Sequence, residues 1–164
     1  MKWQPLALAL IPTVIAWGIT VWQVRKQRVR QVEDVYVARY WSLLDRFTLA
    51  TLRGTDGHEP GTEEQTAIRL YFRLCEDEAD LRAQGWVSDD TWRVWRDAMT
   101  AALRRQPFAR MWAETLADAT AGRDYSFVHL RALSDDPGYD PPASGFLRRC
   151  LRRAPWRRAV RRGR

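Results

Sequence analysis

Two groups of acidic and histidine side chains have the chemistry to bind a metal ion. Asp56, His58 and Glu59 lie close together, and four carboxylates follow further along the chain: Glu76, Asp77, Glu78 and Asp80. Neither group has the ligand spacing of a recognised zinc or calcium site. For the second group we favour a solvated helix face, with i,i+4 ion pairs joining Arg73 to Asp77 and Glu78 to Arg82. We therefore predict no metal site and no cofactor.

The two cysteines, Cys75 and Cys150, have different sequence environments. Cys75 falls on the apolar stripe of a predicted helix, so we interpret it as a small core residue rather than a nucleophile. No zinc-binding spacing and no disulfide framework is present, and a cytoplasmic domain would keep both thiols reduced.

Arg123 and His129 are the candidate catalytic residues, because an arginine and a histidine separated by a short spacer resemble the motif of HEPN ribonucleases. Those enzymes are helical bundles in which the two side chains of a dimer face a scissile phosphate. The resemblance implies that Arg123 would stabilise developing negative charge and that His129 would transfer a proton. The chain has 25 arginines, however, so this spacing also arises readily by chance. We favour a packed polar His129 and keep the ribonuclease as an alternative.

The elements that would position these residues are helices. Apolar side chains recur at spacings of three and four, as on one face of an amphipathic helix, over residues 29–50, 68–79, 92–103 and 108–119. Gly85 should end the second helix and Ser88 should begin the third. No sustained alternation of period two is seen, so we predict an all-α bundle of four helices, closed by a short fifth over 125–133. Trp92, Trp95 and Trp112 should be buried in its core.

An uncharged stretch, Trp3 to Val24, precedes the bundle and predicts a single N-terminal transmembrane helix. A bilayer core about 30 Å thick needs about 20 mostly apolar helical residues. A cleaved signal peptide would have a shorter apolar run and a small-residue cleavage site, and a buried helix of a soluble domain would usually contain a charge. No glycine or proline lies between Trp22 and Arg53, so one unbroken helix is expected from about Thr13 to Arg53.

The charges of the chain are distributed in blocks and indicate its orientation. Four basic residues follow the uncharged stretch between residues 25 and 30, whereas only Lys2 precedes it. Positively charged flanks stay in the cytoplasm. We therefore expect an inner (plasma) membrane protein with its N-terminus outside and its C-terminus cytoplasmic. Residues 31–145 carry 13 arginines and all 20 acidic residues, a net charge of −7 between two basic ends.

The expected domains are the transmembrane helix over 3–24, the cytoplasmic bundle over 25–134, a Pro- and Gly-rich linker over 135–145 and an Arg-rich amphipathic tail over 146–164.

In the tail, an apolar stripe lies opposite basic residues, and the predicted membrane-surface residues are Arg148, Arg149, Arg152, Arg153, Trp156, Arg157 and Arg158. Anionic lipid headgroups use both the charge and the stripe, so we favour them as partner. Nucleic acid and a solvated, disordered tail are the alternatives. Acylation of Cys150 would strengthen a membrane contact.

The run from Leu70 to Trp112 resembles a family of membrane-anchored helical proteins, without an assigned activity, that is found in actinobacteria. The matching features are Tyr71-Phe72, the Gly85-Trp86-Val87 turn, Trp92-x-x-Trp95, Met99 and the segment from Pro107 to Trp112, followed by Phe127. The resemblance implies a fold and a membrane location, and it transfers no functional residue.

The sequence thus favours a membrane-anchored helical binding or scaffold module over an enzyme. Its alternatives are a tethered HEPN-like ribonuclease and a nucleic-acid binder acting through the tail.

Overall fold

The chain folds into helices. The computed structural model describes residues 4–55, 57–120 and 127–144, and their side chains over 16–55, 57–119 and 127–144. The helices are α1 (Gln4–Leu44), α2 (Leu49–Arg53), α3 (Thr62–Gln84), α4 (Asp89–Arg104), α5 (Phe108–Thr120) and α6 (Val128–Asp135). No strand occurs in the described residues, so the predicted all-α helical bundle is confirmed.

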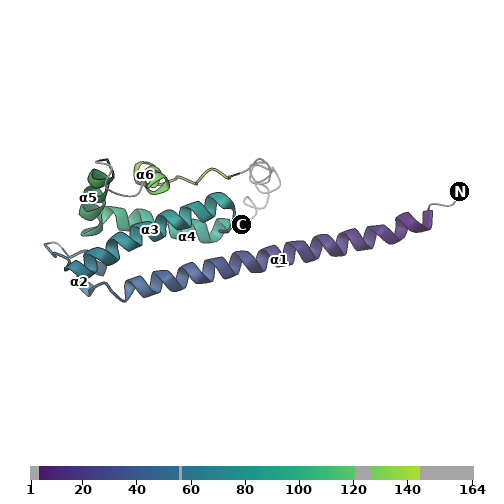
Figure 1. The fold of residues 1–164 in the computed structure, drawn as a ribbon, viewed down its shortest axis with the longest axis horizontal. Helices are drawn as coiled ribbons and strands as arrows, with labels where there is room; N and C mark the ends of the chain where they lie inside the picture. Colours follow the sequence, from purple (N-terminus) through teal and green to yellow (C-terminus); the bar gives the residue numbers. More distant parts are fainter. Residues whose placement is uncertain (1–3, 56, 121–126, 145–164) are drawn as a thin grey trace, which may run out of the picture.

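Helix α1 is the longest element, and its first half extends beyond the bundle (Figure 1). The helix is continuous from the uncharged stretch into the bundle, as predicted. It ends at Leu44, however, so the expected unbroken helix to Arg53 is wrong. Thr48 adopts an extended backbone, with φ −70° and ψ 159°, and its hydroxyl accepts a hydrogen bond from the Thr51 amide to begin α2. The break turns Phe47 into the core, where its ring meets Phe108 edge-on at 5.4 Å.

The sequence predicts a membrane-spanning helix over residues 3–24. Within the part of the chain that the structure describes, no helix is long and apolar enough to cross a membrane.

Helix α3 is the centre of the bundle and packs against α1, α5 and α6. Its inner face is formed by Ile68, Phe72 and Cys75, all of which are almost completely buried. The Phe72 ring packs edge-on against Trp112 at 5.2 Å, and Trp112 packs against Phe127 at 5.4 Å. This chain of edge-to-face contacts joins α3 to α5 and to the start of α6, because aromatic rings favour that geometry in a core.

The ends of α3 and α4 follow the sequence signals. Gly85 takes the left-handed conformation that ends α3, with φ 78°, and the Ser88 hydroxyl accepts a hydrogen bond from the Thr91 amide at the start of α4. Trp92 and Trp112 are buried, as predicted. Trp95 is only partly buried, because it lies at the edge of the core beside Tyr36 of α1.

Residues 136–144, which composition predicts to be part of a linker, lie against α3. Pro141 is fully buried, and the Ser144 amide donates to the Ala83 carbonyl at 2.8 Å. Asp140 forms an ion pair with Arg82 of α3. The described part of this segment is therefore packed on the bundle.

Candidate functional site

The buried polar side chains of the bundle form several distinct clusters. The first surrounds Glu64, near the start of α3. Its carboxylate accepts hydrogen bonds from the backbone N–H of Thr48 at 2.7 Å and from the Thr48 hydroxyl at 2.9 Å, and it lies 3.2 Å from His58 Nε2. Burial alone would raise the pKa of Glu64, but these hydrogen bonds outweigh it and lower the pKa. Glu64 therefore holds two segments against α3: the break between α1 and α2, through Thr48, and the loop after α2, through His58.

His58 and Glu59, two members of the group whose spacing does not predict a metal site, have separate partners. His58 faces Glu64, whereas Glu59 pairs with Arg110 of α5, and Asp56 lies outside the described residues. Among the described side chains, no group of three His, Cys, Asp or Glu residues is placed to hold a metal ion.

The acidic run of α3 is only in part the solvated face that the sequence predicts, since Asp77 is exposed. That prediction is wrong for Glu76 and Glu78, which are only 3% and 6% exposed. The Glu76 carboxylate accepts hydrogen bonds from the backbone N–H groups of His129 at 2.9 Å and Leu130 at 2.8 Å. These N–H groups belong to the first turn of α6, where they have no partner within the helix. Glu76 therefore acts as a helix cap supplied by a distant part of the chain.

Glu78 lies on the side of α3 that faces α1. No hydrogen bond joins its carboxylate to another described residue, and burial, assisted by the nearby charge of Asp77, raises its pKa to about 8. Burial also raises the pKa of Tyr36 and Tyr40 on α1, and Glu78 contributes to both shifts. The α1–α3 interface thus contains a carboxyl group that is neutral in the folded protein near neutral pH.

Arg82 forms the third cluster. It is 5% exposed and donates from Nε and Nη2 to the two carboxylate oxygens of Asp140, both at 2.9 Å. Its Nη1 donates to the Val87 carbonyl and to Asp89. The predicted pairing of Glu78 with Arg82 is replaced by these contacts, which hold the 136–144 segment and the α3–α4 turn together.

His129, a candidate catalytic residue, has both ring nitrogens in contact with a partner. Nε2 lies 3.0 Å from Asp80 Oδ1 and Nδ1 lies 2.8 Å from the Tyr139 hydroxyl, and the His129 side chain is 14% exposed. Burial raises the pKa of Tyr139, so its hydroxyl is not activated as a nucleophile. These contacts join α3, α6 and the 136–144 segment, so the His129 side chain has a structural role. Arg123 lies outside the described residues, and so do Cys150 and the whole tail with its predicted lipid-binding arginines.

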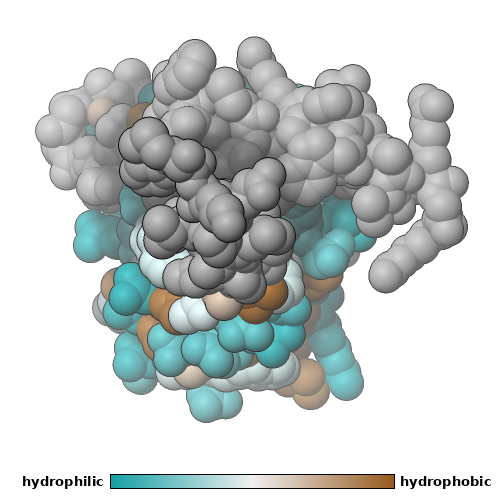
Figure 2. All heavy atoms as spheres, turned by 90° about the vertical axis from the view of Figure 1, so that its right-hand side faces the viewer, coloured by the Kyte–Doolittle hydropathy of each residue, from teal (hydrophilic) through white to brown (hydrophobic). Residues whose placement is uncertain are grey.

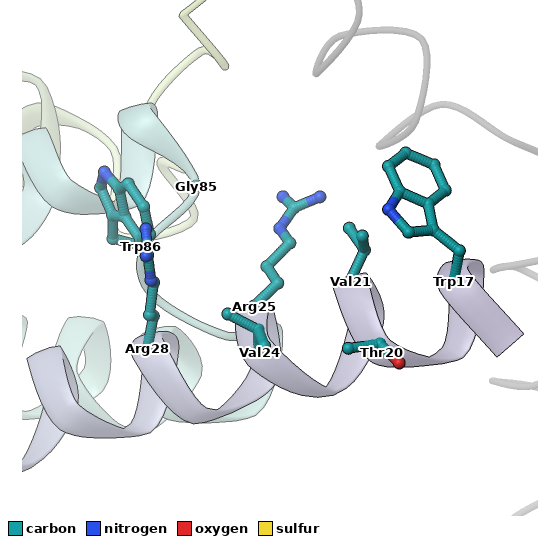
Figure 3. Close-up of a pocket in the computed structure, with 8 residues that line it drawn as sticks. All are labelled: Trp17, Thr20, Val21, Val24, Arg25, Arg28, Gly85 and Trp86. Atoms are coloured by element: carbon teal, nitrogen blue, oxygen red, sulfur yellow. The ribbon is translucent and has the colours of Figure 1, made fainter.

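Among the described residues, a groove between α1 and the α3–α4 turn is a further candidate site, and it has an open face. It encloses about 480 Å³, within the range of small-molecule sites. Figure 3 shows Trp17, Val21 and Arg25 projecting from α1, with Gly85 and Trp86 of the turn at the opposite end. The lining combines apolar surface with two guanidinium groups, those of Arg25 and Arg28.

Sequence reasoning did not find this groove. The sequence predicts that residues 17–28 form a membrane helix and its basic flank, and that Trp86 lies in a turn. The two segments are far apart in sequence, and only the packing of α1 on α3 brings them together. The one signal of the groove in the sequence is that Trp86 directly follows Gly85, the glycine that ends a helix. This pair is not specific for a binding site.

Comparison with protein-family models, with curated proteins and with solved structures finds no match to this chain. The resemblance to an actinobacterial family therefore has no support from these comparisons.

Proposed function

We propose that this protein is a membrane-anchored helical binding or scaffold module, held at the cytoplasmic face of the inner membrane by residues 3–24. The observation that carries the proposal is the continuity of α1. One helix contains the uncharged stretch from Gln4 onward and also packs on α3 in the bundle, so an anchor would be joined rigidly to the domain.

The described part of the uncharged stretch has the exposure expected of such an anchor. Trp17 is 70% exposed and Trp22 is 61% exposed, and Ile19, Val21 and Val24 are also exposed. Trp22 lies near the cytoplasmic end of the stretch, where an indole ring would favour the headgroup layer of a bilayer. Figure 2, viewed from the N-terminal end of α1, shows hydrophobic and hydrophilic residues intermixed on the described surface.

The proposed anchor requires residues 3–15. Residues 16–24, the part of the uncharged stretch whose side chains are described, extend about 14 Å at 1.5 Å per residue, which is about half of a bilayer core. Residues 3–15 contain no charged side chain and would supply the other half. The basic residues from Arg25 to Arg30 would then lie at the cytoplasmic headgroups, close to the bundle.

A binding role is favoured over an enzymatic one by the use that the bundle makes of its polar side chains. Glu64, Glu76, Arg82 and His129 each hold one chain segment against another. Apolar residues on the surface remain available to bind a partner. Trp41 is 60% exposed and Val94 is 67% exposed. The HEPN-like ribonuclease depends on Arg123 and stays an alternative hypothesis.

Alkaline extraction of membranes from cells that express the full chain tests the anchor. The intact protein should stay in the membrane pellet, and a variant without residues 3–24 should be released. Protease added to the periplasmic side should leave a C-terminal tag intact, because the bundle is cytoplasmic. Release of the intact protein by alkali would contradict the proposal.

The tail is proposed to bind the same leaflet through its arginines and apolar stripe. A peptide of residues 143–164 should become helical, by circular dichroism, on anionic vesicles and not on neutral ones. Sequence-independent binding to DNA, without helix formation on vesicles, would favour the nucleic-acid alternative.

A further inference from the structure

The groove between α1 and the α3–α4 turn lies at the level where the proposed anchor leaves the membrane. From Trp17 to Arg28 its α1 wall extends about 16 Å along the helix axis. Trp17 and Val21 belong to the uncharged stretch, and Arg25 and Arg28 immediately follow it. The groove therefore passes from the acyl-chain region to the headgroup region of the cytoplasmic leaflet.

The chemistry of the wall changes in the same direction. Trp17, Val21 and Val24 provide apolar surface at the membrane end of the groove. Arg25 and Arg28 are exposed and lie one helical turn apart, and neither forms an ion pair with another described residue. A guanidinium group binds phosphate oxygens through paired N–H donors, so two of them facing one groove suit a phosphodiester.

The opposite wall is fixed to the bundle. The Ser88 amide donates to Glu33 of α1, and Arg82 holds the Val87 carbonyl at 3.1 Å. Val87 itself is buried. Val87 and Ser88, the two residues after Trp86, are thus held in place. Trp86 closes the end of the groove at which the phosphate would lie.

We propose that this groove binds one anionic phospholipid of the cytoplasmic leaflet, with its phosphate between Arg25 and Arg28 and the first part of an acyl chain along Trp17 and Val21. The inference rests on the proposed membrane anchor. Charge complementarity selects this occupant. Segment 146–164 of the same chain carries nine arginines and no acidic side chain, so it does not complement the two guanidinium groups.

Native mass spectrometry of the full-length protein tests the inference. The protein is reconstituted in phosphatidylcholine nanodiscs with a minor fraction of phosphatidylglycerol and then released into mild detergent. Wild type should retain one phosphatidylglycerol in preference to phosphatidylcholine. The Arg25→Gln/Arg28→Gln variant should bind that lipid at least about tenfold more weakly, because two charge-assisted phosphate contacts are lost.

The Lys26→Gln/Arg30→Gln variant is the matched control, since it removes the same charge from the same helix outside the groove. It should retain the lipid. Val21→Trp tests the site without a change of charge: filling the apolar wall should displace the lipid. Glycerol phosphate in solution should not compete, because it lacks the acyl chain.

The outcomes separate the two proposals. If alkaline extraction releases wild type from membranes, the anchor itself is refuted. If wild type stays in the membrane but shows no preference for phosphatidylglycerol, or if the control variant loses the lipid equally, the groove is not a lipid site. Displacement of the lipid by glycerol phosphate would show a simple phosphate site and would also overturn the inference.

Discussion

The Glu33 carboxylate accepts a hydrogen bond from the Ser88 backbone N–H at 2.8 Å, although the two residues are 55 positions apart. Ser88 is also the residue whose hydroxyl begins α4. This contact therefore joins α1 directly to the start of another helix. It lies near the groove, and it adds to the packing of α1 on α3.

Glu33→Ala should loosen α1 from the α3–α4 turn. The loss of a hydrogen bond to a charged acceptor costs about 1.5–3 kcal/mol of unfolding free energy. Hydrogen exchange at the Ser88 amide of the full-length protein in mild detergent should become correspondingly faster. Asp34→Ala, at the exposed neighbouring position, is the control and should leave that exchange unchanged. Equal exchange in wild type and Glu33→Ala would show that this contact does not hold the turn.

Glu76→Ala should release α6 from the bundle. Two backbone N–H groups would lose a charged acceptor in a buried setting, and each such bond contributes about 1.5–3 kcal/mol. We expect a large fall in melting temperature and early exchange of amides in residues 128–135. Glu63→Gln, an exposed change on the same helix, should have little effect. A melting curve that Glu76→Ala leaves unaltered would contradict the capping role.

Trp112 should contribute more to stability than Trp95. Trp112 is 4% exposed, its ring packs between Phe72 and Phe127, and its Nε1 donates to Ser134 Oγ. Truncation of a buried indole to alanine costs about 3–5 kcal/mol. Trp95→Ala should cost clearly less, because Trp95 lies at the edge of the core. If Trp112→Ala unfolds the domain, Trp112→Phe gives a smaller, measurable loss of stability. A lower denaturant midpoint for Trp95→Ala than for the Trp112 variant would contradict this order.

The helices could be predicted from sequence because their apolar spacing and end signals are local. Ser88 and Gly85 act within a few residues, and both behave as expected. The break at Thr48 could not be predicted in this way. It depends on Glu64, sixteen residues away, whose carboxylate accepts from the Thr48 amide and hydroxyl. An apolar stripe continues through the break, so spacing alone favoured a continuous helix.

The acidic run was misread for the same reason. Four acids on one helix indicate a solvated face when nothing else is known, but Glu76 meets two amides of α6 that only the folded chain brings close. The 136–144 segment has the composition of a linker, and Arg82 gives it a buried partner through Asp140. In each case the deciding contact is between residues distant in sequence. The groove between Arg25 and Trp86 was missed for that reason too.

The stability of the protein should fall as pH rises through the neutral range because of Glu78. Its pKa in the folded protein is about 8, against 4.5 for an unperturbed glutamate. In the unfolded chain the group is already ionised at pH 7, whereas in the folded protein it still binds a proton. Because the folded state binds more protons, the free energy of unfolding is highest near and below pH 4.5 and decreases until about pH 8. Each pH unit within this window amounts to at most about 1.4 kcal/mol, a few kcal/mol in all.

Glu78→Gln isolates this effect, because glutamine has a similar shape and stays neutral at every pH. Denaturant midpoints of the full-length protein in non-ionic detergent should be similar for wild type and Glu78→Gln at pH 5. Above pH 8 the variant should be the more stable, since it avoids a buried charge beside Tyr36 and Tyr40 that no described hydrogen bond compensates. Asp77→Asn, at an exposed position beside Glu78, should preserve most of the wild-type slope, because burial is the larger cause of the Glu78 shift. Parallel pH profiles for wild type and Glu78→Gln would show that Glu78 ionises in the folded protein as easily as in the unfolded chain.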